Sequence, residues 1–219
     1  MSSALALQAT DIQKQDAKFI MERITGVKWA ADNPVMVQAT QMIVAGNRVG
    51  AAALAVQQAQ FLNVTIKSFG LQMSTREETI RIPLNDFTAS IIGVTRDEID
   101  ARQLLFGNFY YVGDPAKLPA NLDNVVANLN SLGSEVLRSN DHYMALDNPR
   151  VNIGDVLIRI TGQRIFQSES NGAYNLVLNP DPGGVLNSRA FLEAHAIAGT
   201  NRRLVEYTMR QFACLPIEA

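Results

Sequence analysis

The chain has few of the residues that most often carry chemistry in proteins. Its 219 residues include one cysteine, two histidines and one tryptophan. The single cysteine, Cys214, excludes an intrachain disulfide, a metal site built from several cysteines and the Cys-x-x-Cys-His attachment of a c-type haem. The two histidines, His142 and His195, have no Glu-x-x-His motif beside them and fall short of a metal-ligand set. We therefore predict no metal site and no covalently bound cofactor.

An excess of one charge and long apolar runs are also missing. The 19 basic and 21 acidic residues leave a formal net charge of −2, so no strong field favours nucleic acid or an anionic membrane. No stretch reaches the roughly eighteen uncharged apolar residues of a transmembrane helix. The N-terminal residues 1–19 lack the basic leader and long apolar core of a secretory signal. We expect neither a nucleic-acid partner nor a transmembrane segment, and no signal peptide in this sequence.

What the sequence does contain is a strong helical signal. Hydrophobic residues make up 47% of the chain, and helix caps outnumber hairpin turns throughout. The pattern predicts a mainly α fold, an irregular multi-helix bundle with a C-terminal helical hairpin and at most a short β element. We expect a single helical domain over residues 1–219, with a loop-rich segment at about 114–152. Composition alone leaves open whether this protein forms oligomers.

Cap residues place the predicted helices along the chain. Asn33-Pro34 is a strong start signal, and Gly26 is a typical stop. Gly50 is expected to let a neighbouring helix approach closely. Ser74 and Thr75 each begin a capping box, and Thr95 begins another. The predicted helices cover residues 11–25, 33–45, 48–60, 61–73, 83–93 and 95–105.

The second half of the chain is more varied. Residues 106–113 are aromatic and bounded by glycines, which predicts a short strand or an ordered loop. One helix is expected within 122–137 and another over 154–162, whereas the polar residues 163–175 predict an exposed loop.

The segment 183–216 predicts two helices joined by a tight turn. Asn187 or Ser188 is expected to cap the first helix, and Gly199 to end it in a left-handed conformation. Leu192 and Phe212 are expected to be buried where the two helices pack against the core.

Three segments together resemble a known family. They are FIMERITG near the start, LNDFTASIIGVTRDEIDARQLLFGNFYYVG in the middle and GGVLNSRAFLEAHAIAGTNRRLVEYTMRQFACLPIE at the end. In this order they are similar to planctomycete-type cytochrome-associated exported bacterial proteins, which usually occur with c-type haem domains. The resemblance implies a helical module of the cell envelope, periplasmic or extracellular, whose partner is a protein such as a c-type cytochrome. Any haem would then be carried by that partner.

The histidines are the candidate ligand or acid–base residues. His142 follows Asp141, whose carboxylate is placed to orient the imidazole. We favour a solvated histidine or one that pins its loop. His195 lies one turn after Phe191 on a predicted helix, and we favour a packing role over a ligand role.

Arginines are the candidate contacts for an anion or a partner. Arg202 and Arg203 fall in the first turn of the last helix, where the helix dipole disfavours cations. An internal salt bridge to Asp181, Glu193 or Glu206 would explain them, and so would an external phosphate or carboxylate. We favour the internal network.

Other polar residues leave further readings open. Asp97, Glu98 and Asp100 are interpreted as stabilising a helix start, although paired acid–base or calcium-binding carboxylates are alternatives. Arg159 is a third candidate anion or partner contact. Cys214 is expected to be a buried, apolar thiol.

The resemblance and these residues leave three functions open, and the resemblance implies the first of them. The first is a non-enzymatic interaction or structural module that docks a c-type cytochrome or another exported partner. The second is a redox-enzyme component that binds haem noncovalently through His142 or a methionine. The third is a hydrolase or binding protein with a site around Asp97, His142 and Arg159. No residue set in the sequence identifies a catalytic centre.

Overall fold

A computed structural model describes residues 9–118, 135–170, 172–196 and 201–215. The chain divides into two compact units, Met1–Thr65 (unit 1) and Ile66–Ala219 (unit 2), which are described separately below. The described residues are mainly α-helical, as the sequence predicts. The expectation of a single domain stays a prediction, because compactness alone does not show whether a unit folds independently.

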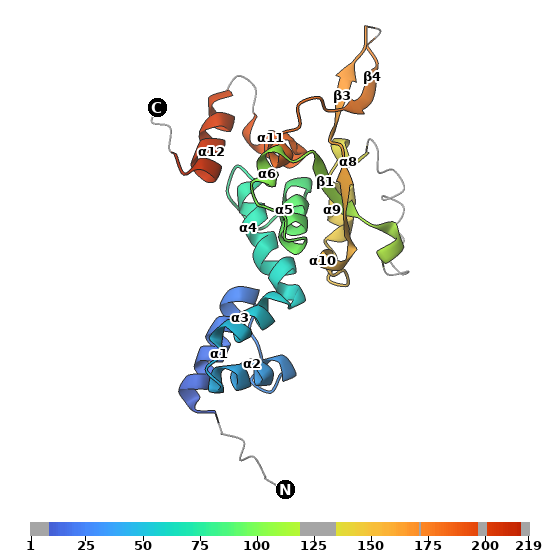
Figure 1. Cartoon of the computed structure of the whole chain (residues 1–219). Helices are drawn as coiled ribbons and strands as arrows, with labels where there is room; N and C mark the ends of the chain where they lie inside the picture. Colours follow the sequence, from blue (N-terminus) through green and yellow to red (C-terminus); the bar gives the residue numbers. More distant parts are fainter. Residues whose placement is uncertain (1–8, 119–134, 171, 197–200, 216–219) are drawn as a thin grey trace. The chain divides into compact units, whose positions relative to one another are not determined.

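Three helices form unit 1, followed by a π-helical segment (Figure 1). Their bounds are Asp11–Thr25 (α1), Pro34–Val44 (α2), Arg48–Val56 (α3) and Phe61–Ile66 (η1), the last of which continues into unit 2. Local chemistry fixes the ends. Asn33 accepts a hydrogen bond from the Val35 amide and Pro34 occupies the first turn. Gly26 ends α1 at a φ of 72°, which a side chain would strain.

The core of unit 1 is built from small side chains. Ala17, Ala39, Ala51 and Ala55 are all fully buried, which lets the three helices lie close together. Met21, Met36 and Ile43 fill the remaining space. Gly50 does not serve a neighbouring helix as expected, because a Cβ there would meet the side chain of Asn47, the N-cap of α3.

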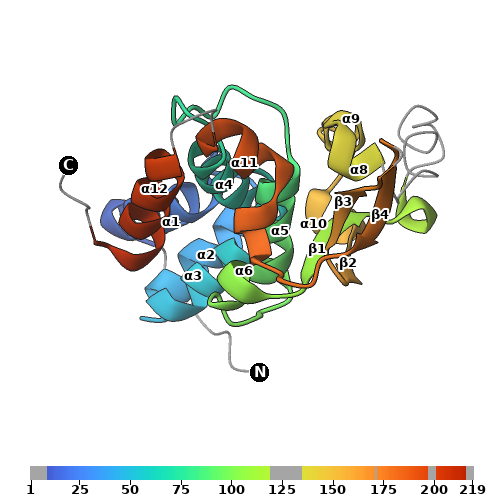
Figure 2. The same ribbon diagram turned by 90° about the horizontal axis from the view of Figure 1, so that it is seen from above.

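Unit 2 is organised around one buried helix. Helix α5 (Asp86–Arg96) has every residue from Asp86 to Val94 buried. It packs against α4 (Lys67–Met73), against the sheet of β1 (Phe109–Gly113) and β2 (Leu157–Thr161), and against α11 (Arg189–His195) (Figure 2). The Phe87 and Phe191 rings stack at 5.5 Å, and Val185, Ile91 and other apolar residues complete the cluster.

Unit 2 contains further elements among the described residues. They are α6 (Gln103–Phe106), β1 (Phe109–Gly113), η2 (Pro115–Lys117), α8 (Glu135–Arg138), α9 (Asp141–Leu146), α10 (Ile153–Val156), β2 (Leu157–Thr161), β3 (Arg164–Ser168), β4 (Tyr174–Leu178), η3 (Gly184–Asn187), α11 (Arg189–His195) and α12 (Asn201–Ala213). No helix among the described residues is long and apolar enough to cross a membrane.

Two antiparallel strand pairs form, which is more than the single short β element expected. The predicted strand forms as β1, and it pairs with β2 so that Tyr111 lies opposite Arg159. Strand β3 pairs with β4, and this hairpin projects from unit 2 (Figure 1). The helix predicted over 154–162 is wrong beyond α10, because Ile158, Ile160 and Thr161 are β-branched and find a partner strand. The segment 163–175 is mostly exposed, as predicted, but it is not a loop throughout, because Arg164–Ser168 forms a strand that pairs with β4.

Two predicted capping boxes are also wrong. Ser74 ends α4 instead of starting a helix, and its hydroxyl accepts a hydrogen bond from the Asn85 side chain at 2.8 Å. Asn85 is the residue that caps α5. Thr95 lies inside α5, where its hydroxyl donates to the Ile91 carbonyl.

The C-terminal helices agree with the sequence at one end. Ser188 caps α11 by accepting from the Phe191 amide. Gly199 and the predicted turn lie outside the described residues. Leu192 is 38% exposed, so its predicted burial is wrong. Phe212 is half-buried and meets the Phe191 ring at 6.4 Å.

Candidate functional site

His142 is a structural residue of unit 2. Its side chain is 2% exposed, and its Nε2 accepts a hydrogen bond from the Gly113 amide at 3.0 Å. The ring meets Tyr143 edge to face. His142 therefore pins the end of β1, and the alternative of a solvated ring is wrong. Asp141 is exposed in the first turn of α9, and Nε2 is held by the Gly113 amide instead of that carboxylate.

His195 packs between helices, as the favoured interpretation has it. It is fully buried, and its ring stacks on Tyr207 of α12 at 3.8 Å. Its Nε2 lies 3.4 Å from the Met73 carbonyl oxygen. Burial lowers the pKa of His195 below its usual value, although the Met73 contact opposes this shift. A buried, neutral imidazole between two helices suits packing better than ligation.

The paired arginines of α12 have no ion pair among the described residues. Arg202 is exposed. Arg203 donates to the Arg76 carbonyl oxygen at 3.3 Å, so a backbone acceptor takes the place of the expected carboxylates. Cys214 is exposed and has a φ of 53°, so its predicted burial is wrong.

Asp97 and Arg159 lie near each other around the Tyr111 side chain. The Tyr111 hydroxyl donates to Asp97 Oδ2 at 2.6 Å, and Arg96 Nε donates to Oδ1 at 2.7 Å. Burial opposes ionisation of Asp97, but these two hydrogen bonds together lower its pKa. Arg96 also donates to the Gly154 carbonyl. The network fastens the end of α5 to the sheet, so the predicted helix-start role of Asp97 is wrong.

Its neighbours Glu98 and Asp100 also lie outside a helix start. Glu98 takes a φ of 53° in the turn after α5, and Asp100 pairs with Arg102. Of the three residues in the hypothesised site, Asp97 and Arg159 lie close enough for the arginine charge to help lower the pKa of Asp97, without a direct ion pair between them. His142 is committed to Gly113 instead.

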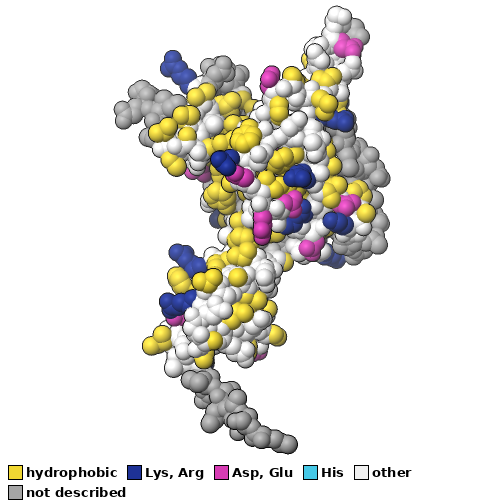
Figure 3. Space-filling model, viewed as in Figure 1, with side chains coloured by type: hydrophobic (Ala, Val, Ile, Leu, Met, Phe, Trp, Pro, Cys, Tyr) yellow, Lys and Arg dark blue, Asp and Glu magenta, His cyan; other side chains and the backbone are white. Residues whose placement is uncertain are grey.

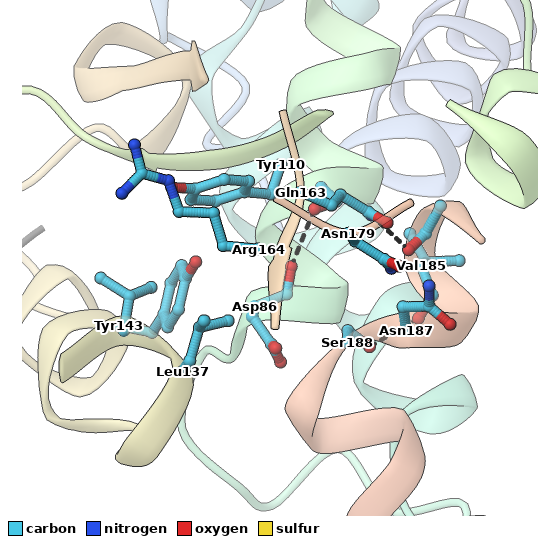
Figure 4. A pocket seen from close by; sticks show the side chains of 13 residues that line it. Asp86, Tyr110, Leu137, Tyr143, Gln163, Arg164, Asn179, Val185, Asn187 and Ser188 are labelled. Atoms are coloured by element: carbon cyan, nitrogen blue, oxygen red, sulfur yellow. Dashed lines mark hydrogen bonds between the residues drawn. The ribbon is translucent and has the colours of Figure 1, made fainter. Parts of the chain in front are cut away.

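A small cavity of about 40 Å³ lies beside α5 (Figure 4). Asp86 lines it, and its carboxylate accepts hydrogen bonds from the Phe87, Arg189 and Ala190 amides. Burial raises the pKa of Asp86, and the Ala190 amide opposes the shift. Gln163 also lines the cavity and donates to the Gly184 carbonyl at 2.7 Å.

Asp86, which lines this cavity, has a structural role. Asp86 joins the start of α5 to the start of α11, and its oxygens are already engaged by backbone amides. A space of about 40 Å³ holds water but no organic substrate. We therefore interpret Asp86 as a buried structural residue whose carboxylate ties the first amides of α11 to the start of α5.

A large apolar hollow lies on unit 1, between α1, α2 and the segment that joins them. Its volume is about 740 Å³. We call it the Trp29 groove, and we define it by Lys14, Lys18, Trp29, Met36, Val37 and Val44. Its walls come from two helices and its rim carries two cations.

Comparisons with known proteins assign no function to this chain. No protein family, curated protein or solved structure matches the chain.

The indole of Trp29 is held in place within the groove. Its Nε1 donates to Thr25 Oγ1 at 2.8 Å, and the Thr25 hydroxyl donates to the Met21 carbonyl at 2.7 Å. This relay ties a half-buried aromatic ring to the end of α1. A rigid aromatic side chain at a partly open apolar surface is typical of the anchors in protein interfaces.

Sequence reasoning missed the groove, although one signal was present. Helix α2 carries apolar residues on two faces, since Met36 and Ile43 are buried while Val37 is 44% exposed. An amphipathic helix with a single buried stripe does not need the second face.

Among the described residues, no group of three or more His, Cys, Asp and Glu side chains is arranged to hold a metal ion.

Proposed function

We propose that the chain is a non-enzymatic helical interaction module of the bacterial cell envelope, and that it docks a protein partner through the Trp29 groove. The observation that carries this proposal is the groove itself, an apolar hollow of about 740 Å³ with a fixed tryptophan. Small-molecule pockets and helix-binding grooves share this size and lining. Hydrophobic side chains also lie at the surface elsewhere on unit 1 (Figure 3). Phe19 and Val49 are among the exposed ones.

The charges on the rim favour an acidic partner segment. Lys14 lies 3.5 Å from Asp11, and Lys18 lies 3.9 Å from Glu22. Exposed pairs of this kind contribute at most about 1 kcal/mol, so a partner carboxylate can replace them at little cost. The occupant that fits is an amphipathic helix with apolar residues toward Trp29 and acidic residues toward the two lysines.

A c-type cytochrome is the partner that the family resemblance favours, and in this proposal it carries the haem. The histidines of this chain do not fit axial ligation of a haem. Nε2 of His142 accepts from Gly113, and His195 is buried against Tyr207. For the alternative of noncovalent haem binding, His142 is therefore not a suitable axial ligand.

The proposal also takes α11 and α12 as a hairpin that closes unit 2. Ring contacts between the two helices support it, since Tyr207 meets Phe191 at 5.9 Å and His195 at 3.8 Å.

Site-specific crosslinking in the native organism tests the partner. A photoreactive amino acid replaces Val37 in the groove, and in a matched variant it replaces Val49, which is 82% exposed on α3 and does not line the groove. We expect a crosslinked species that stains for haem and fractionates with the envelope, from position 37 alone. The same products from both positions, or products made only with cytosolic proteins that lack haem, would refute the proposal.

A further inference from the structure

A second hollow, on unit 2, is lined by three arginines from three elements. It has a volume of about 490 Å³. Arg138 comes from α8, Arg164 from β3 and Arg189 from α11. We call it the arginine cleft. Glu193 is the one carboxylate among its lining residues, so cations outnumber anions around it.

Two of these arginines have no carboxylate partner within the described part of the chain. The ion pairs there include neither Arg138 nor Arg164. Both side chains are exposed, yet they border the same hollow. Like charges that share one cleft repel each other, and an anion between them removes that cost.

Two of the three cations are also held in position. The Arg138 guanidinium lies over the Phe166 ring at 4.7 Å, a cation–π contact that restrains its planar fork. Arg189 pairs with Glu193 and donates to Asn140 Oδ1 at 2.9 Å. Its Nε is buried and has no partner among the residues described. Restrained guanidinium groups lose less entropy when they bind a carboxylate or phosphate.

Apolar side chains line the rest of the cleft. Ile165 and Leu192 are each 38% exposed there, and Leu137 and Phe166 lie beside them. A bare inorganic ion would leave this surface unused. A ligand with an apolar body and one anionic group would cover it.

We propose that the arginine cleft binds a small organic anion, a phosphate monoester or carboxylate with an aromatic or alkyl body. Arg138 and Arg164 bind the anionic group, and Leu192 contacts the body. This site lies in unit 2 and is independent of the Trp29 groove.

Phosphorus NMR titration of the full chain with phenyl phosphate tests this proposal, with inorganic phosphate as the second probe. We expect saturable binding of phenyl phosphate at least roughly tenfold tighter than that of inorganic phosphate. Arg164→Gln and Arg138→Gln should each weaken phenyl phosphate binding by roughly tenfold, because a charge-assisted bidentate contact is lost. Benzoate, followed by proton NMR, shows whether a carboxylate serves equally.

Two further variants separate a built site from general attraction. Arg150→Gln removes an exposed arginine that does not line the cleft, and it should bind phenyl phosphate as the unmodified chain does. Leu192→Ser should weaken phenyl phosphate and leave inorganic phosphate unchanged. Thermal unfolding of each variant confirms that it folds. The proposal is overturned if phenyl phosphate does not saturate, if it binds no tighter than phosphate, or if Arg150→Gln weakens it as much as Arg164→Gln.

Discussion

At the scale of single residues, His195 shows how burial changes the protonation of a side chain. His195 is fully buried, and burial lowers its pKa below the usual value of 6.5. As the pH is lowered, His195 therefore takes up a proton at a higher pH in the unfolded chain than in the folded chain. The contribution of His195 to stability is fully present above about pH 6.5, the usual pKa of histidine, and it is lost as the pH falls through the lower pKa of the folded state.

We expect His195→Phe to remove this pH dependence. An aromatic ring can keep the stack on Tyr207, while the titrating group is lost. Urea midpoints measured at about pH 7.5 and about pH 5.5 should differ more for the unmodified chain than for the variant. Equal shifts in both proteins would mean that His195 titrates as it does in water.

At the scale of elements, the contact between α5 and β1 depends on one glycine. A Cβ on Gly93 would lie 2.3 Å from the Tyr111 ring. That ring cannot move freely, because its hydroxyl is tied to Asp97. Overpacking typically costs about 1–3 kcal/mol, while alanine adds about 1 kcal/mol of helix propensity.

Because a Cβ at 2.3 Å from a restrained ring calls for the upper end of that cost, Gly93→Ala should lower the free energy of unfolding by about 2 kcal/mol after the gain in helix propensity, measured by urea titration. Gln72→Ala on α4 is the control, because its side chain is exposed, and it should change stability by less than about 0.5 kcal/mol. A silent Gly93→Ala would show that α5 and β1 are less tightly packed than described.

Some features of the elements could be predicted from the sequence, and others could not. The Asn33-Pro34 and Ser188 caps were predictable, because a cap depends on residues within one turn. Strand β2 was not, since Arg159 and its neighbours gain their partners only when β1 is placed opposite. The contact of His142 spans 29 positions to Gly113. The Trp29 groove likewise exists only once α1 and α2 have packed.

At the scale of the whole molecule, the two units have separate cores. Met21 is fully buried in one and Phe87 in the other. Met21→Ala should cost about 2–5 kcal/mol. Native-state hydrogen exchange should then show faster exchange in unit 1 and unchanged protection in unit 2, and Phe87→Ala should do the reverse. Faster exchange throughout the chain in both variants would support the single domain that the sequence predicts.

The central claim is that the Trp29 groove docks an acidic amphipathic helix. Trp29 is the only tryptophan of the chain, so its fluorescence reports on the groove directly. The most direct measurement is a fluorescence titration with a synthetic helix that carries leucines on one face and glutamates on the other. We expect saturable binding that Val37→Asp weakens by at least about tenfold, while Val49→Asp leaves it unchanged. Replacing Lys14 and Lys18 together by glutamate should shift the preference to a lysine-faced helix. Equal losses from Val37→Asp and Val49→Asp, or no change in fluorescence, would contradict the account.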